Sequence, residues 1–207
     1  MTRPQDAALA AEIGASYVGV IFAEGPRKVS PDKAHEILAA AGAGIAHVGV
    51  FDTNDADRVV EVADEVGLNV VQLHADPMPS DIEAIRRNFD GDIWAAIRIA
   101  GNHIPHEYDE LFDLADGVLL DARSENKLGG TGVALPWNEL AVDLARDRGG
   151  AAVVLAGGLN SRNVANAIRV LAPDVVDVSS GIESAPGIKD PWLMREFYEA
   201  AIGHTVP

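Results

Sequence analysis

Short apolar runs alternate with longer amphipathic stretches along almost the whole chain. Seven runs rich in Val and Ile have the length of buried strands, and they predict β-structure. They cover residues 17–22, 46–51, 70–74, 93–99, 117–121, 152–156 and 175–180. The regular alternation predicts an α/β fold in which helices pack outside a parallel sheet.

The amphipathic stretches carry recognisable helix boundaries. Ser30 stands before Pro31, which suits a first helical position. Ser80 and Glu83 have the spacing of a capping box, and Gly67 is placed to end the third helix. We count eight such helices, of which the one near 106–113 has the weakest pattern.

The number of predicted helices helps to choose between two architectures. A doubly wound open sheet and a (β/α)₈ TIM barrel both fit the alternation, and eight helices favour the barrel. The chain starts on a helix, so strand 1 of such a barrel is absent or truncated in this sequence, and we expect a short strand just before Met1. Without it the strands at 17–22 and 175–180 would be unpaired edges. We expect residues 1–207 to form a single barrel domain.

Composition and charge exclude several classes of function. The 16 basic and 32 acidic residues give a net charge of −16, the opposite of a nucleic-acid-binding surface. No apolar run is long enough for a membrane helix, and the N-terminus lacks the pattern of a signal peptide. We therefore expect a cytoplasmic protein with no nucleic-acid or membrane partner. The chain has no cysteine, and no spacing of His and carboxylates predicts a metal site.

In a barrel of this kind the active site lies at the carboxyl ends of the strands. Gly157-Gly158 follows the sixth run, and Ser179-Ser180-Gly181 ends the seventh. Glycines allow backbone N–H groups to approach an anion, and the last two loops of such barrels often hold a phosphate. The pair of loops predicts a phosphate site, whereas glycines that only make tight turns remain the alternative.

Polar residues at other strand ends are further candidates. Asp121 ends an apolar strand and suits either a catalytic carboxyl or an ordinary cap. Gln72 and His74 alternate with Leu73, so both face inward if either does. His74 is either a proton carrier or an interior histidine with a satisfied partner. Arg98 is expected to pair with a nearby carboxylate.

Several motifs spread over the chain are shared with one family of barrel enzymes. They are Thr2-Arg3-Pro4, Pro26-Arg27, Gln72-Leu73-His74, Leu120-Asp121, Gly129-Gly130-Thr131-Gly132, Leu155 through Leu159, Asp177-Val178-Ser179-Ser180-Gly181, Pro186-Gly187 and Lys189-Asp190. In these stretches the chain resembles the phosphoribosylanthranilate isomerases of tryptophan biosynthesis. The stretch that begins at Asp177 is the most specific of them.

The resemblance implies an Amadori rearrangement of N-(5-phosphoribosyl)anthranilate that needs no metal and no organic cofactor. It implies that Asp121 is the general acid, that Arg27 contacts the anthranilate carboxylate and that the phosphate lies on backbone N–H groups. The expected partner is a small phosphoribosyl substrate, and the oligomeric state stays open between monomer and homodimer. The expected substrate-binding residues are Arg27, Gln72, His74, Gly158, Asp177, Ser179, Ser180 and Gly181.

The main departure from the family concerns the general base, and a smaller one is Ala75, where relatives often have Gly after the His. The general base of the family is a Cys in a Lys-x-Cys-Gly strand just before the stretch that matches Thr2, and that strand is not in this sequence. If the strand is truly lost, His74 is the inward group left to act as a base. The alternatives are another phosphosugar isomerase with paired carboxylates, or an inactive barrel that only binds a phosphorylated ligand.

Overall fold

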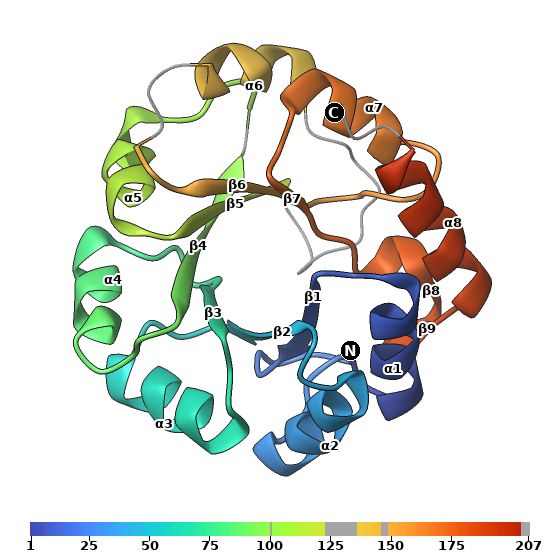
Figure 1. The fold of residues 1–207 in the computed structure, drawn as a ribbon. Helices are drawn as coiled ribbons and strands as arrows, with labels where there is room; N and C mark the ends of the chain where they lie inside the picture. Colours follow the sequence, from blue (N-terminus) through green and yellow to red (C-terminus); the bar gives the residue numbers. More distant parts are fainter. Residues whose placement is uncertain (100, 123–135, 146–148, 204–207) are drawn as a thin grey trace.

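The computed structural model describes residues 1–99, 101–122, 136–145 and 149–203. Its strands form one parallel sheet in chain order from β1 to β7, with helices outside it (Figure 1). The strands are β1 (Tyr17–Ile21), β2 (Ala46–Phe51), β3 (Val70–Leu73), β4 (Asp92–Ile99), β5 (Gly117–Ala122), β6 (Ala152–Leu155) and β7 (Val175–Val176). The predicted seven-stranded barrel architecture is confirmed.

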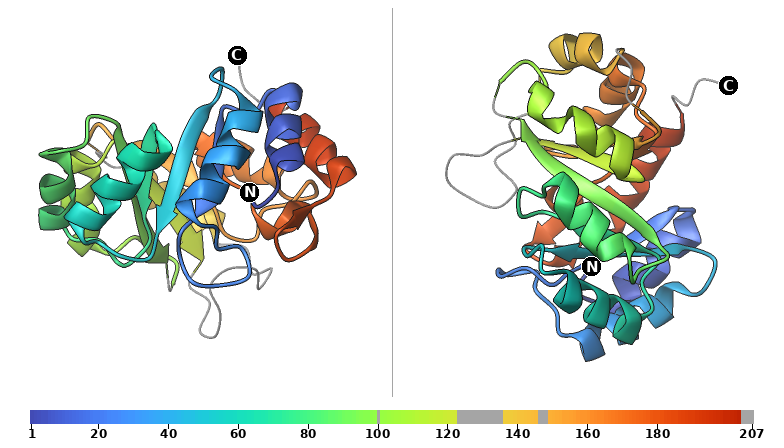
Figure 2. Two further views of the ribbon diagram at one scale, coloured as in Figure 1. Left: turned by 90° about the horizontal axis from the view of Figure 1, so that it is seen from below. Right: turned by 90° about the vertical axis from the view of Figure 1, so that its left-hand side faces the viewer.

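Eight α-helices lie in the described part, as the pattern predicted. They are α1 (Pro4–Ile13), α2 (Pro31–Ala41), α3 (Ala56–Val66), α4 (Pro79–Arg86), α5 (Asp109–Leu114), α6 (Trp137–Leu144), α7 (Val164–Leu171) and α8 (Pro191–Ile202). A 3₁₀ turn over Ser180–Ile182 leads into a small hairpin of β8 (Glu183–Ala185) and β9 (Ile188–Lys189). Figure 2 shows from two further sides that the helices cover the outer face of the curled sheet. None of the described helices is long and apolar enough to span a bilayer.

Side chains alternate between the two faces of each strand, and this divides the core in two. The outer faces pack against the helices, whereas a smaller apolar cluster fills the inside of the curled sheet. Its buried members are Val48, Val70, Trp94, Ala96, Leu119, Val154 and Ala156. Tyr17 meets Trp94 edge-on within this cluster, with ring centroids 5.0 Å apart. Further along the same inward rows, the strands present polar side chains instead.

Local capping explains several helix boundaries. The Ser30 hydroxyl accepts a hydrogen bond from the Lys33 N–H at 3.3 Å, which confirms the predicted start of α2. At α8 the Asp190 carboxylate accepts from the Trp192 N–H at 2.8 Å. Gly67 ends α3 in the left-handed region at φ 72°, as predicted.

The capping box predicted from Ser80 and Glu83 is wrong. Helix α4 begins at Pro79, and the Asp81 carboxylate accepts a hydrogen bond from the Met78 N–H at 2.8 Å. The fixed φ of proline suits the first helical position, so the helix starts earlier than the Ser80 pattern indicates.

The last strand is shorter than its apolar run. The predicted strand at 175–180 is observed only at Val175–Val176, and its last ladder bond runs from the Asp177 N–H to the Leu155 carbonyl at 2.8 Å. The chain then turns, because Gly181 packs against the backbone of the neighbouring loop at Leu159. A Cβ atom built on Gly181 would lie 1.9 Å from the Leu159 oxygen.

Candidate active site

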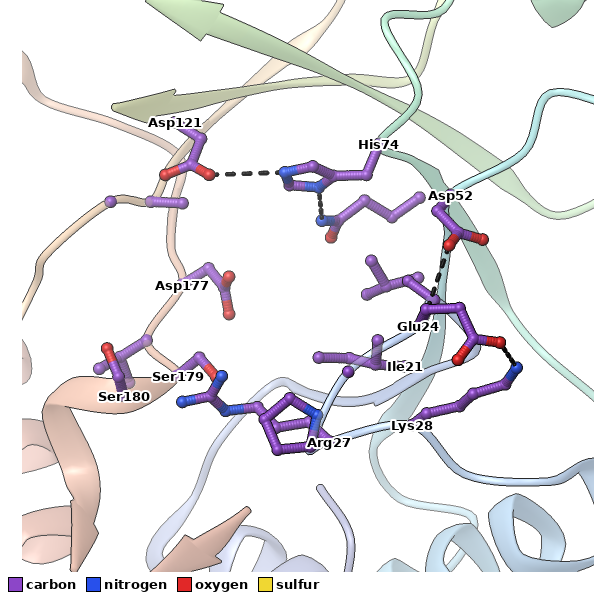
Figure 3. Close-up of a pocket in the computed structure, with 18 of the residues that line it drawn as sticks. Ile21, Glu24, Arg27, Lys28, Asp52, His74, Asp121, Asp177, Ser179 and Ser180 are labelled. Carbon is purple, nitrogen blue, oxygen red and sulfur yellow. Dashed lines mark hydrogen bonds and ion pairs between the residues drawn. The ribbon is translucent and has the colours of Figure 1, made fainter. Parts of the chain in front are cut away.

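A pocket opens at the carboxyl ends of the strands, where the inward rows of side chains become polar (Figure 3). Its lining comes from the ends of β1, β2, β3, β5, β6 and β7 and from the loops that follow them. Of the predicted site residues, the pocket brings together Arg27, Gln72, His74, Asp121, Gly158, Asp177, Ser179 and Ser180. Gly181, the residue after Ser180, is not among the described residues that line this pocket. The strand-end rule therefore located the cavity correctly.

Asp121, His74 and Gln72 form a chain of polar contacts in the pocket, and Figure 3 shows Asp121 and His74 pointing toward one another. The His74 Nε2 lies 3.4 Å from the Asp121 Oδ2, and both side chains are about four-fifths buried at 18% and 21% exposure. Gln72 is buried, and its amide nitrogen lies 3.2 Å from the His74 Nδ1. Because an amide nitrogen only donates, this orientation places the proton of a neutral His74 ring on Nε2, toward Asp121.

A second carboxyl, that of Asp177, lies on the same side of the pocket as Asp121 and points into it (Figure 3). Asp177 is exposed to the solvent of the pocket, although protein atoms crowd around its carboxyl. Desolvation raises the pKa of Asp177, and the charge of Asp121 raises it further, whereas Lys189 and His74 act in the opposite direction. The sequence predicted Asp177 only as a substrate-binding residue, whereas the structure shows that it is also a titratable group near Asp121. The two-residue alternation along β7 was the pattern that indicated it.

Two loops converge at the predicted phosphate site. Gly157 and Gly158 both adopt positive φ, at 81° and 67°, which disfavours other residues there. The Gly158 carbonyl accepts from the side-chain amides of Asn160 and Asn163 at 3.3 and 3.0 Å, which fixes the loop. Within the described residues, the backbone N–H groups of Gly158 and Ser180 make no hydrogen bond. These donors are available to an anion.

Arg27 enters the pocket from the loop after β1, already engaged by a carboxylate. Its Nε and Nη2 lie 2.9 and 2.7 Å from the two oxygens of Glu183. Lys189 holds Glu183 from the other side, with Nζ 3.1 Å from Oε1, and also donates to the Ser179 carbonyl at 2.8 Å. Lys189 was predicted only as part of a shared motif and Glu183 was not singled out, because nothing local in the sequence indicates a contact across 156 residues.

The remaining candidates have local explanations or lie outside the described residues. Arg98 donates to the His74 carbonyl at 2.7 Å and lies 3.5 Å from the Asp76 carboxylate, which confirms its predicted local pairing. The motif Gly129-Gly130-Thr131-Gly132 falls outside the described residues. Among the residues that are described, no cluster of His, Asp and Glu is arranged to hold a metal ion.

Comparison with known proteins identifies the family. The family model described as N-(5'phosphoribosyl)anthranilate (PRA) isomerase matches residues 1–200. This chain belongs to the N-(5'-phosphoribosyl)anthranilate isomerase family. The isomerase of that name from Rubrobacter xylanophilus is 43% identical over 204 residues, covering 97% of this chain and 95% of the relative. The Geotalea uraniireducens isomerase is 38% identical and covers 98% and 96%.

Solved isomerase structures share the fold over nearly the full length. The phosphoribosylanthranilate isomerase of Thermotoga maritima superposes with a TM-score of 0.85 at 31% identity, covering 98% of this chain and 96% of that one. A related isomerase was solved with reduced 1-(o-carboxyphenylamino)-1-deoxyribulose 5-phosphate. It is 30% identical and superposes with a TM-score of 0.82, covering 98% of this chain and 95% of that one. The resemblance found in the sequence, the barrel fold and the isomerase class are confirmed. The roles of single residues stay predictions.

Proposed function

We propose that this chain converts N-(5'-phosphoribosyl)anthranilate into 1-(2-carboxyphenylamino)-1-deoxyribulose 5-phosphate, as the name of its family indicates. One observation supports it most directly. The pocket of this isomerase-family chain combines a strand-end carboxyl at Asp121, backbone N–H groups at Gly158 and Ser180 that no described residue engages, and a guanidinium at Arg27. These groups match the reacting sugar, the phosphate and the carboxylate of such a substrate.

The chemistry requires an acid and a base in sequence. Asp121 gives a proton to the furanose ring oxygen while the bond from C1 to that oxygen breaks. The lone pair of the anilino nitrogen forms the C=N bond of a protonated Schiff base. A base then removes the C2 proton, the C–H electron pair forms the C1=C2 bond, and the C=N pair returns to nitrogen. The resulting enaminol gains a proton at C1 and loses the proton of its C2 hydroxyl to become the ketone. His74 lies beside Asp121 and is placed to return its proton.

The phosphate end of the substrate needs strong local donors in this protein. The chain carries a net charge of −16, so its long-range field repels a phosphorylated substrate. Backbone N–H groups of the loops around Gly158 and Ser180–Gly181 supply dipoles close to the phosphate, where they outweigh distant charges screened by salt. We place the phosphate there, with Ser179 and Asp177 beside it and Gln72 and His74 toward the sugar.

Replacing Arg27 by alanine is expected to weaken binding of the substrate carboxylate. A charge-assisted hydrogen bond contributes enough that KM should rise about tenfold or more, with little change in kcat. Steady-state kinetics measures both. Arg195→Ala is a matched control, because Arg195 pairs with Glu12 on the outer surface. An unchanged KM in Arg27→Ala would remove Arg27 from the carboxylate site.

The identity of the general base is tested by comparing two chains. The printed sequence contains no cysteine, so a base within it has to be a pocket group such as His74 or Asp177. The assay follows the loss of substrate fluorescence, coupled to the next enzyme, for this 207-residue chain and for one extended upstream by Lys-Ile-Cys-Gly. Turnover by the 207-residue chain assigns the base to the pocket, and turnover only after extension assigns it to the added cysteine. No turnover by either chain would contradict the proposed function.

A second aminoaldose isomerase activity has one observation in its favour. Such chemistry uses paired strand-end carboxylates, and Asp121 and Asp177 share the pocket. Its substrate carries two phosphates, whereas the described pocket offers one pair of phosphate-binding loops. We expect a substrate with two phosphates to compete poorly. Binding of phosphoribosyl ligands without turnover by either chain would favour the inactive barrel.

We also propose the domain organisation, the cellular location, the oligomeric state and the cofactor requirement of the protein. We infer that residues 1–207 act as one domain in the cytoplasm, as a monomer or homodimer, with no metal and no organic cofactor. Support comes from the family membership and from the acid–base character of the pocket residues. Size-exclusion chromatography and activity after dialysis against a chelator test these points.

A further inference from the structure

A buried cluster of three charged side chains lies beside the pocket and connects the loop after β1 with the segment after β7. Arg27, Glu183 and Lys189 have exposed side-chain fractions of 20%, 4% and 5%. Glu183 follows the 3₁₀ turn at Ser180–Ile182, and Lys189 lies on β9. The cluster therefore joins the loop that carries Arg27 to the loop assigned to the phosphate.

The contacts of Arg27 leave one edge of its guanidinium free. Its Nε–H and one N–H of Nη2 point to the Glu183 carboxylate, at 2.9 and 2.7 Å. The other edge, at Nη1, makes no hydrogen bond within the described residues, and Arg27 lines the pocket. A planar guanidinium held along one edge offers the opposite edge in a fixed direction.

We propose that Glu183 is a positioning residue, which holds Arg27 so that its free edge meets the carboxylate of the substrate's anthranilate ring. This inference rests on the function proposed above. Without Glu183, the long Arg27 side chain would sample many rotamers, and ordering it on binding would cost affinity. Glu183 itself does not touch the substrate.

Lys189 explains why Glu183 does not cancel the attraction of Arg27 for an anion. An isolated Arg27–Glu183 pair is neutral, whereas a second cation on Glu183 leaves the cluster with a net positive charge. Burial lowers the pKa of Lys189, but the charge and the hydrogen bond of Glu183 act against that shift. Burial alone would raise the pKa of Glu183. The hydrogen bond from Arg27 and the contacts of Lys189 lower this pKa by more, so the net shift is downward and the carboxylate stays ionised.

A purely structural role for the cluster makes a different prediction. If the ion pairs only tie the loop after β1 to the β8–β9 hairpin, loss of Glu183 would weaken all ligands alike. If Glu183 positions Arg27, the loss depends on whether the ligand carries the ring carboxylate. Two ligands that differ only in that group separate the two roles.

The experiment measures binding, so it does not depend on turnover. The probes are reduced 1-(o-carboxyphenylamino)-1-deoxyribulose 5-phosphate and its counterpart without the carboxylate. Calorimetric titrations compare the wild-type chain, Glu183→Gln and the control Glu12→Gln, which alters the exposed carboxylate that pairs with Arg195. We expect Glu183→Gln to bind the carboxylated probe about tenfold more weakly. Its affinity for the other probe should stay within about twofold, and Glu12→Gln should bind both like the wild type.

The outcomes separate the inference from the function on which it rests. A wild-type chain that binds neither probe would contradict the proposed function. Equal losses for both probes, no loss, or tighter binding of the carboxylated probe by Glu183→Gln would overturn the positioning role. Glu183→Asp serves if the glutamine variant does not fold, because it keeps the charge but withdraws it from Arg27, and it should show the same selective loss.

Discussion

Asp121→Asn is expected to abolish most of the turnover while leaving the fold and ligand binding intact. An asparagine amide has the shape of the carboxyl but cannot transfer a proton to the ring oxygen. Loss of a general acid typically lowers a rate by about 10²- to 10⁴-fold, and we expect kcat to fall by about 10³-fold. The fluorescence assay measures kcat on whichever chain, the 207-residue or the extended one, turns over.

Two controls make the Asp121 result specific. Asp64→Asn makes the same chemical change on the exposed face of α3, far from the pocket, and should leave kcat unchanged. Binding of reduced 1-(o-carboxyphenylamino)-1-deoxyribulose 5-phosphate to Asp121→Asn should stay within about threefold of the wild type, since the carboxylate and phosphate contacts remain. Turnover of Asp121→Asn within about tenfold of the wild type would remove Asp121 as the acid.

The strands were predictable because buried parallel strands have no polar face to interrupt their apolar runs. The run at 46–51 coincides with β2, and that at 117–121 ends one residue before β5 does. The run at 175–180 predicted too long a strand, because apolar and small residues continue past Val176. The chain leaves the sheet there to form a turn against Leu159, which is a contact between distant segments.

In the pocket too, residues placed by a local pattern were predictable, whereas contacts between distant segments were not. Asp121, Gln72 and His74 were predictable because each stands at the end of an inward row, and two-residue periodicity places its side chain. The hydrogen bond from Gln72 to His74 could not be assigned from the sequence, since it depends on side-chain rotamers. Glu183 was not predicted as a partner of Arg27, because 156 residues separate them and no local sequence pattern indicates such a pair.

Gly181→Ala is expected to damage the phosphate site through a single added methyl group. The φ of Gly181 is outside the left-handed region, so alanine meets no intrinsic backbone penalty there. Its Cβ would instead lie 1.9 Å from the Leu159 carbonyl oxygen and 3.0 Å from the carbonyl carbon. Both neighbours are backbone atoms, so no flexible side-chain end is able to move aside. The loops that carry Gly158 and Ser180 must therefore separate.

Separation of the two loops moves the N–H donors away from the phosphate. Each charge-assisted hydrogen bond lost weakens binding by roughly 10- to 100-fold, so we expect KM and the inhibition constant of inorganic phosphate to rise by about that factor. Gly44→Ala is the matched control, because an added Cβ there meets nothing within 4 Å and Gly44 also lacks a positive φ. It lies before β2, at the opposite end of the strands from the pocket. Unchanged phosphate inhibition in a folded Gly181→Ala would show that the phosphate binds elsewhere.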